Sequence, residues 1–160
     1  MSARAALQCA LRPMSVRDLP SVAAIEATIY SHPWTSGNFR DALNAGYSCW
    51  VMEGSAGLIG YGVLMVGVDE AHLLNLSIAH EMQGRGLGRA LLLHFLGVAR
   101  GAEVAQVLLE VRRSNSVARQ LYESEGFREV HVRRDYYPAK NGREDAILMR
   151  LALRYAPAAE

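Results

Sequence analysis

A glycine-rich segment constrains this chain more than any other part of its sequence. The residues Gln-Gly-Arg-Gly-Leu-Gly-Arg-Ala at positions 83–90 lie between apolar runs at 71–78 and 90–99, which are typical of a strand and a helix. Glycine lets backbone N–H groups approach a ligand closely and adopts dihedral angles that other residues avoid. The N-terminus of a helix adds unpaired N–H donors and a partial positive charge. The segment therefore predicts a phosphate-binding loop.

Two well-known phosphate-binding loops do not fit this spacing. The glycines fall at 84, 86 and 88, so the pattern differs from the Gly-x-Gly-x-x-Gly of dinucleotide-binding folds. The Gly-Lys-Ser/Thr of a P-loop is also missing, which argues against Mg²⁺–ATP chemistry. The simpler alternative is a plain turn whose glycines only allow tight packing of a helix on a strand. The two arginines among the glycines favour an anion site over that alternative.

Length and composition bound the remaining possibilities. The 160 residues correspond to one domain, and 51% hydrophobic and 21% charged residues are typical of a globular protein. The net charge of +1 argues against bulk electrostatic binding to nucleic acid or a membrane. No apolar run approaches the ~20 residues of a membrane span, and the N-terminus lacks the core of a signal peptide. We therefore expect a cytoplasmic protein with frayed ends at 1–6 and 155–160.

The cysteines and histidines predict no disulfide and no metal site. Cys9 and Cys49 form no Cys-x-x-Cys pair, and two ordinary thiols are the simpler interpretation. The five histidines have no metal-ligand spacing; they lie at 32, 72, 80, 94 and 131.

The order of the predicted elements indicates the fold class. We expect strands at 7–14, 47–52, 58–68, 71–78, 107–111, 127–134 and 145–153. We expect helices at 19–29, 36–43 and 90–100, and a last helix that Ser114 or Asn115 caps and that runs to 125. Ser15 and Asp18 suit a helix start, while Gly101 and Gly126 suit helix ends. The strand–helix–strand unit around the glycine loop implies a parallel pair, and the strands before it imply an antiparallel half. This order predicts an α/β (mixed α+β) fold, with a mixed sheet on which helices pack.

The residues around and after the loop resemble a known family. Gln83-x-x-Gly86-x-Gly88 is similar to the acetyl-coenzyme A signature of the GCN-five-related N-acetyltransferases (GNAT). The likeness extends through Leu-Leu-Glu-Val-Arg at 108–112 and Leu-Tyr-Glu-Ser-Glu-Gly-Phe at 121–127. Arg-Arg-Asp-Tyr-Tyr-Pro at 133–138 and Gly-Arg-Glu-Asp-Ala at 142–146 resemble the RimI type, the bacterial ribosomal-protein alanine N-acetyltransferases. The resemblance covers roughly residues 10–152 and is densest over 71–149.

This resemblance implies an architecture and an activity. It implies a single GNAT domain over residues 1–160, with a core at about 10–152. The sheet would be mixed and mostly antiparallel, with one splayed pair of parallel strands and helices on both faces. Acetyl-coenzyme A would be the co-substrate, without a metal, and the N-terminal alanine of a small-subunit ribosomal protein would attack it directly in a ternary complex. Another protein N-terminus, a small amine, or a non-catalytic acetyl-coenzyme A-binding module remain alternatives, and the oligomeric state stays open.

Glu110 is the candidate general base. An α-amino group has a pKa near ~8, so a carboxylate that acts through water can deprotonate it. Glu110 lies in an apolar strand, where an uncompensated charge is costly. The pattern alone equally allows a partly exposed strand face formed by Leu108, Glu110 and Arg112. The resemblance assigns Glu110 to the position of the family's base.

Tyr122 is the candidate acid that protonates the departing coenzyme A thiolate. Val117, Ala118 and Leu121 share a helical stripe with it, and this pattern on its own favours core packing. The resemblance assigns Tyr122 to the position of the family's proton donor.

The resemblance also assigns the cofactor-binding residues. Asn115 matches a coenzyme A contact and suits a helix cap as well. Gly84 departs from the family pattern, in which Arg or Lys is frequent. The strand and loop residues expected to hold acetyl-coenzyme A are Leu76, Ser77, Ile78, Gln83, Gly84, Arg85, Gly86, Leu87, Gly88 and Arg89. The backbone of the first three would hold the acetyl-pantetheine arm, because a splayed strand leaves N–H and C=O groups available.

Two aromatic residues are candidates for binding the acceptor. Trp34 and Tyr137 lie in segments that resemble those lining the family's peptide groove, although loop packing explains them equally well. Four acids could favour a basic peptide, but ordinary solvated acids are the simpler interpretation; they are Glu26, Asp41, Glu144 and Asp145.

Overall fold

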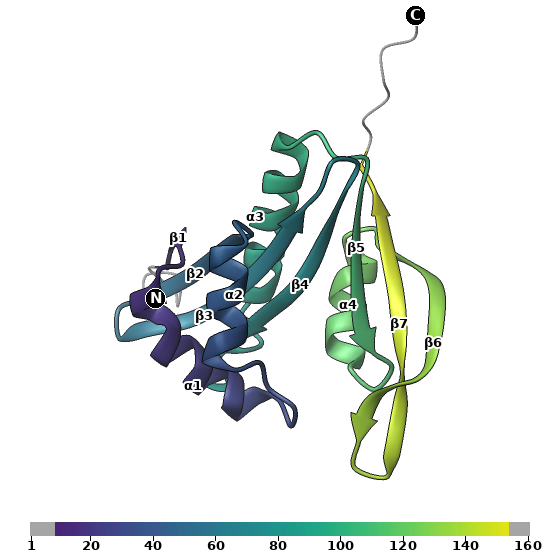
Figure 1. Ribbon diagram of the computed structural model, residues 1–160, viewed down its shortest axis with the longest axis horizontal. Coiled ribbons are helices and arrows are strands. Elements are labelled where there is room, and N and C mark those ends of the chain that lie inside the picture. The colour runs from purple at the N-terminus through teal and green to yellow at the C-terminus, as the bar shows by residue number, and fades with distance from the viewer. Residues whose placement is uncertain (1–8, 154–160) are drawn as a thin grey trace, which may run out of the picture. The chain divides into compact units, whose positions relative to one another are not determined.

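The computed structural model describes residues 9–153, and its elements follow the predicted order (Figure 1). The strands are β1 (Ala10–Pro13), β2 (Ser48–Gly54), β3 (Gly57–Val66), β4 (Glu70–Ile78), β5 (Gln106–Arg112), β6 (Arg128–Ala139) and β7 (Gly142–Ala152). The helices are α1 (Leu19–Ile29), α2 (Ser36–Asn44), α3 (Leu87–Gly101) and α4 (Ser116–Ser124), with the short 3₁₀ helices η2 (Val16–Asp18) and η3 (His80–Met82). The ends predicted to fray, at 1–6 and 155–160, lie outside the described residues.

Hydrogen bonds join the strands in the order β1-β2-β3-β4-β5-β7-β6. The β4–β5 pair is parallel, whereas the β1–β2, β2–β3, β5–β7 and β6–β7 pairs are antiparallel. The mixed, mostly antiparallel sheet with a parallel pair is therefore confirmed. The described chain forms two compact units, residues 9–64 with 75–94 and residues 65–74 with 95–153, so that β4 contributes to both.

The core of the first unit is built from helices and strands that contribute one or two apolar residues each. Val22 of α1, Phe39 of α2, Val51 of β2 and Tyr61 of β3 are fully buried there. The rings of Phe39 and Tyr61 meet edge to face, with centroids 5.6 Å apart. The buried positions of α1 are Leu19, Val22 and Glu26. The face of the helix that packs into the core therefore includes an acid.

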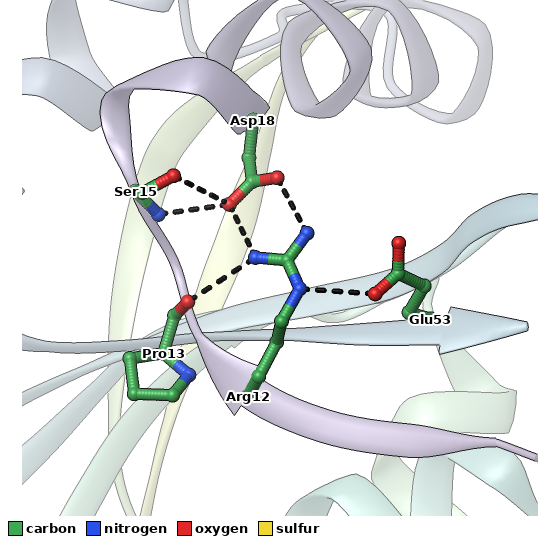
Figure 2. Close-up of polar contacts among 5 residues, drawn as sticks. All are labelled: Arg12, Pro13, Ser15, Asp18 and Glu53. Carbon is green, nitrogen blue, oxygen red and sulfur yellow. Dashed lines mark hydrogen bonds and ion pairs between the residues drawn. The ribbon is translucent and has the colours of Figure 1, made fainter.

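An arginine of β1 joins η2 and β2 within the first unit. Figure 2 shows the Arg12 guanidinium between the carboxylates of Asp18 and Glu53. Arg12 donates two bonds of 2.8 Å to Asp18 and one of 3.0 Å to Glu53. The bonds from Arg12 hold the pKa of Asp18 below its usual value. Asp18 also accepts from the Ser15 N–H at 2.8 Å, which confirms the predicted helix start, although the first turn is a 3₁₀ helix.

The second unit is organised around β5. The parallel ladder with β4 runs from Glu70–Gln106 to Leu73–Leu109, and both strands continue beyond it. On its other edge β5 pairs with β7, which lies between β5 and β6 (Figure 1). Side chains of β5 alternate between buried and half-buried positions, and Glu110 belongs to the half-buried set. Glu110 therefore lies on the partly exposed strand face that the sequence pattern allowed as an alternative.

Helix ends differ from the predictions in two places. Helix α3 begins at Leu87, so the last part of the glycine-rich segment is already helical. Gly101 is still helical, and the left-handed residue after the helix is Glu103, with φ 59°. Gly126, with φ 99°, follows α4 as predicted.

The β6–β7 hairpin is longer than the sequence pattern indicated. Pairing is irregular between Arg133 and Tyr137 and then resumes up to Ala139–Gly142. Asp135 lies in this irregularity with φ 52°, and its N–H donates to the Asp145 carboxylate at 3.0 Å. The irregular stretch breaks the alternation on which a strand prediction depends, which explains why the predicted strands stopped on either side of it.

Candidate acetyl-transfer site

The glycine-rich loop has the backbone that its sequence predicts. Gly84 and Gly86 have φ values of 76° and 80°. A Cβ atom built at either position meets no atom of residues 9–153 within 4 Å, so glycine is required there by conformation, not by space. The loop leads directly into α3, where the Ala90 N–H closes the first turn onto the Gly86 carbonyl at 3.1 Å. The earlier N–H groups of such a turn have no partner within the helix, which makes the loop a suitable anion cradle.

Side chains of the loop anchor it to its surroundings. Gln83 donates from Nε2 to the Ile78 carbonyl at 2.9 Å, and Arg85 donates to the Glu81 carbonyl at 3.3 Å. His80 Nε2 lies 2.9 Å from the Thr28 carbonyl oxygen, which ties η3 to α1. Leu87 is buried, so only its backbone can face a ligand. The structure thus shows Gln83 shaping the loop; its predicted contact with a cofactor stays a prediction, as do those of Arg85, Gly88 and Arg89.

The end of β4 leads into this loop and is held on the β3 side. Ala79 donates its N–H to the Ile59 carbonyl at 2.8 Å. Gly60 of β3 lacks a side chain where a Cβ atom would lie 2.6 Å from Ile78 Cδ1 and 3.0 Å from the Ser77 carbonyl. Ser77 and Ile78 are buried, and Leu76 is half-buried. These residues, predicted to hold the acetyl-pantetheine arm, lie on the part of β4 beyond its ladder with β5.

Glu110 lies on β5 with a side chain that is 27% exposed. Its carboxylate is 3.4 Å from an Arg133 guanidinium nitrogen of β6. A half-buried carboxylate with a single ion pair keeps lone pairs available for water or substrate. This environment is suitable for a proton acceptor.

Tyr122 lies on α4 and is only 8% exposed. Its ring packs against Phe127 with centroids 5.7 Å apart, which confirms the packing role. The predicted apolar stripe is wrong for Val117, which is 80% exposed, because this short helix buries only the side that carries Tyr122. The role of the hydroxyl group as a proton donor remains a prediction.

Asn115 caps α4. Its Oδ1 accepts a bond of 3.2 Å from the Ala118 N–H, as predicted. The cap holds the start of α4 directly after β5, and the coenzyme A contact assigned to Asn115 remains a prediction.

Trp34 and Tyr137 belong to different units and have different surroundings. The Trp34 ring packs on Phe39 with centroids 5.1 Å apart, which makes it part of the core of the first unit. Tyr137 is half-buried beneath the Arg112 guanidinium, 4.5 Å from the ring centroid. Burial, and then the nearby charge of Glu110, raise the pKa of Tyr137 to about 12. The structure therefore brings Tyr137 close to the candidate base.

Four acids are interpreted as solvated from the sequence, and three of them are buried or paired with an arginine in the structure. Glu26 is buried, at 2% exposure. Glu144 accepts from Arg112 at 2.9 Å, and Asp145 pairs with Arg113 at 3.2 Å. Only Asp41 is exposed. Sequence reasoning missed Glu26, although the spacing 19, 22 and 26 already places it on the buried face of α1.

The two cysteines are free thiols, as predicted. Cys49 is buried, and burial raises its pKa to about 11. Such a thiol is a poor nucleophile at neutral pH, which argues against an acyl-cysteine route through Cys49.

Within residues 9–153, none of the helices combines the length and hydrophobicity needed to cross a membrane. Within the same part of the chain, no three His, Cys, Asp or Glu residues are grouped as a metal ion would require.

Comparisons with known proteins show which family the chain resembles over most of its length. The model of the Acetyltransferase (GNAT) domain matches residues 45–129. The [ribosomal protein bS18]-alanine N-acetyltransferase of Escherichia coli (strain K12) is 38% identical over 140 residues, which cover 88% of this chain and 95% of the relative. The protein of that name from Haemophilus influenzae is 35% identical over 133 residues, covering 82% and 90%. The crystal structure of the ribosomal-protein-S18-alanine N-acetyltransferase from Escherichia coli superimposes with a TM-score of 0.89 at 36% identity, covering 94% of this chain and 97% of that one.

Proposed function

Because the chain belongs to the GNAT acetyltransferase family, we propose that it acetylates the N-terminal alanine of ribosomal protein bS18. The chain is an acetyl-coenzyme A-dependent N-acetyltransferase. Its relatives of known name act on bS18, and the similarity to them extends over nearly the whole of both chains. The observation that carries the proposal is the loop at 83–89, with positive φ at two glycines and a helix start directly after them. A ribosomal substrate also implies action in the cytoplasm.

In this proposal the first unit holds the donor. Acetyl-coenzyme A supplies the acetyl thioester when it is bound. No atom of the described residues lies within 4 Å of a Cβ built at Gly84 or Gly86, so a pyrophosphate could approach the backbone there. Backbone N–H groups at the start of α3 would bind its oxygens, and Arg85 and Arg89 would add positive charge. Backbone groups of β4 at Leu76–Ile78 would bind the pantetheine arm, and one N–H would polarise the thioester carbonyl.

Glu110 and Tyr122 carry out the proton transfers. Glu110 accepts one proton from the α-ammonium group of the acceptor through a water molecule, which frees the nitrogen lone pair for attack on the acetyl carbonyl. Tyr122 donates its hydroxyl proton to the sulfur as the carbon–sulfur bond breaks. The proton that the new amide nitrogen releases restores the Tyr122 hydroxyl. Asn115 would contact coenzyme A from the cap of α4, while Trp34 and Tyr137 would bind the acceptor peptide.

The glycine loop provides a test of donor binding. We expect Gly86→Ala to raise the Kd of acetyl-coenzyme A by about 5- to 30-fold, since a non-glycine residue at φ 80° costs roughly 1–2 kcal/mol unless the loop rearranges. Isothermal titration calorimetry measures this Kd. Gly97→Ala is the matched control, because Gly97 lies inside α3 with open space around it and should tolerate alanine. Equal affinity in the two variants would remove Gly86 from the donor site.

A comparison of acceptors tests the proposed substrate. Peptides that begin with the bS18 alanine, the same peptides that begin with Ser or Met, and polyamines are each incubated with acetyl-coenzyme A and the full chain. We expect the highest kcat/KM with the alanine peptide, together with loss of that acetyl group from bS18 in cells that lack this chain. Preferred transfer to a polyamine would support a small-amine acetyltransferase. Tight acetyl-coenzyme A binding without transfer to any acceptor would indicate a binding module.

A further inference from the structure

The carboxylate of Glu26 is buried in the first unit and surrounded by hydrogen-bond donors. The side chain lies on α1, and the residue is 2% exposed. Oε1 accepts from the Tyr61 hydroxyl at 2.8 Å and from Asn75 Nδ2 at 3.2 Å. Oε2 accepts from the backbone N–H of Trp34 at 2.9 Å. All three donors are neutral groups, and an acceptor-only carboxylate is the form that matches them.

The hydrogen bonds continue from Glu26 to the end of β4. Asn75 Oδ1 accepts from the Ser77 hydroxyl at 2.7 Å, and the Ser77 and Tyr30 hydroxyl oxygens lie 2.7 Å apart. Burial first, and then the negative charge of Glu26, raise the pKa of Tyr61, so its hydroxyl stays protonated and able to donate. A single carboxylate thereby links α1, β3, β4 and the segment between α1 and α2.

Core packing alone does not explain an acid at this position. Leu19 and Val22 occupy the same buried face of α1, so an apolar residue at 26 would continue the core. A buried carboxylate without a cationic partner is costly, and hydrogen bonds from neutral groups offset only part of that cost. Of the three donors, the Trp34 N–H is the one whose position depends most on its hydrogen bond to Glu26, because Trp34 lies in the segment between α1 and α2.

We propose that Glu26 is a positioning residue for the acceptor. It fixes the backbone at Trp34 against the Asn75–Ser77 part of β4, and so orients the acceptor-binding segment toward the strand that binds the acetyl arm. The inference rests on the proposed function, in which Trp34 contacts the peptide and Leu76–Ile78 hold the donor. Glu26 itself touches neither substrate.

Glu26→Gln tests the proposal with little change in volume. The carboxamide has one acceptor oxygen where the carboxylate has two, and it carries no charge, so the hydrogen bond that the Trp34 N–H donates is lost or weakened. We expect the KM of the acceptor peptide to rise roughly tenfold. The KM of acetyl-coenzyme A should stay within about twofold, since Glu26 does not contact the glycine loop. Hydrogen exchange at the Trp34 amide should accelerate about tenfold, the factor that one lost hydrogen bond implies.

Two variants control this measurement. Asp41→Asn removes an exposed acid of α2 and should leave both KM values unchanged. Tyr61→Phe removes one donor to Glu26 and keeps the hydrogen bond from the Trp34 N–H. We expect this variant to fold and to raise the KM of the acceptor peptide about threefold. It therefore tests the proposal even if Glu26→Gln does not fold.

An unchanged peptide KM in Glu26→Gln and Tyr61→Phe, or an equal rise in both KM values, would overturn the proposal. Unchanged exchange at the Trp34 amide in Glu26→Gln would overturn it as well. If wild type acetylates no alanine peptide, it is the proposed function that fails, so the two failures are distinguishable. The measurements then use whichever acceptor the wild type modifies.

Discussion

Replacing Glu110 with Gln is expected to lower kcat by about 10²–10⁴-fold, the range that a general base contributes. Glutamine keeps the size of the side chain but cannot accept a proton from the α-ammonium group. The Kd of acetyl-coenzyme A should change little, because the proposed donor-binding residues are the loop, the end of β4 and Asn115, and Glu110 is not one of them. Single-turnover kinetics and calorimetry on the same variant separate the two effects.

The pH dependence of Glu110→Gln provides a second check. An α-amino group loses its proton near pH ~8 without assistance, so the deficit in rate should shrink as the pH rises above that value. The substitution also removes the ion pair with Arg133, whose guanidinium lies 3.4 Å from the carboxylate. Arg133→Gln removes the same ion pair and keeps the base, so it is the matched control and should retain most of the activity. Wild-type turnover in Glu110→Gln would exclude Glu110 from the mechanism.

Replacing Tyr122 with Phe should reduce kcat by about 10²-fold or more, the lower end of the range for a general acid. The ring that packs on Phe127 is kept, so the melting temperature should stay within a few degrees of wild type. The loss arises because the coenzyme A sulfur then leaves as an unprotonated thiolate. The measurement is kcat as a function of pH for the variant and the wild type.

Tyr122→Leu is the companion variant, since it removes both the hydroxyl group and the aromatic packing. A normal rate and pH profile in Tyr122→Phe, combined with a loss of stability in Tyr122→Leu, would assign the residue to packing alone. That outcome would leave Glu110 and the donor loop in place and would require another proton donor.

The predictions that succeeded concern features encoded by neighbouring residues. A short apolar run predicts β5, and Asn115 and Gly126 mark the two ends of α4. The loop glycines at 84 and 86 adopt the backbone that their spacing implies. Each of these features depends on steric limits within a few residues, so the sequence is sufficient to predict it.

The predictions that failed concern which helix and strand surfaces pack against one another in the folded chain. Val117 has the spacing of a core residue but is 80% exposed, because no other element covers that side of α4 in the described chain. The irregular pairing near Asp135 extends the last hairpin beyond the predicted strands. Helical and strand periodicity describes one element at a time and contains no information about its partners.

The sequence by itself determined the order of the elements, the donor loop and the family, because these follow from local dihedral limits and short motifs. Only the tertiary structure decided the surroundings of the acids. Glu26 meets Asn75 across 49 residues, and Glu110 lies 3.4 Å from Arg133 of a later strand. Whether an acid is solvated, paired or buried depends on groups that chain folding brings together from distant positions, and such pairing sets its energy and its chemistry. Glu26 has the helical spacing of a core residue and the charged side chain of a surface residue. Only its contacts in the folded chain decide between these two interpretations.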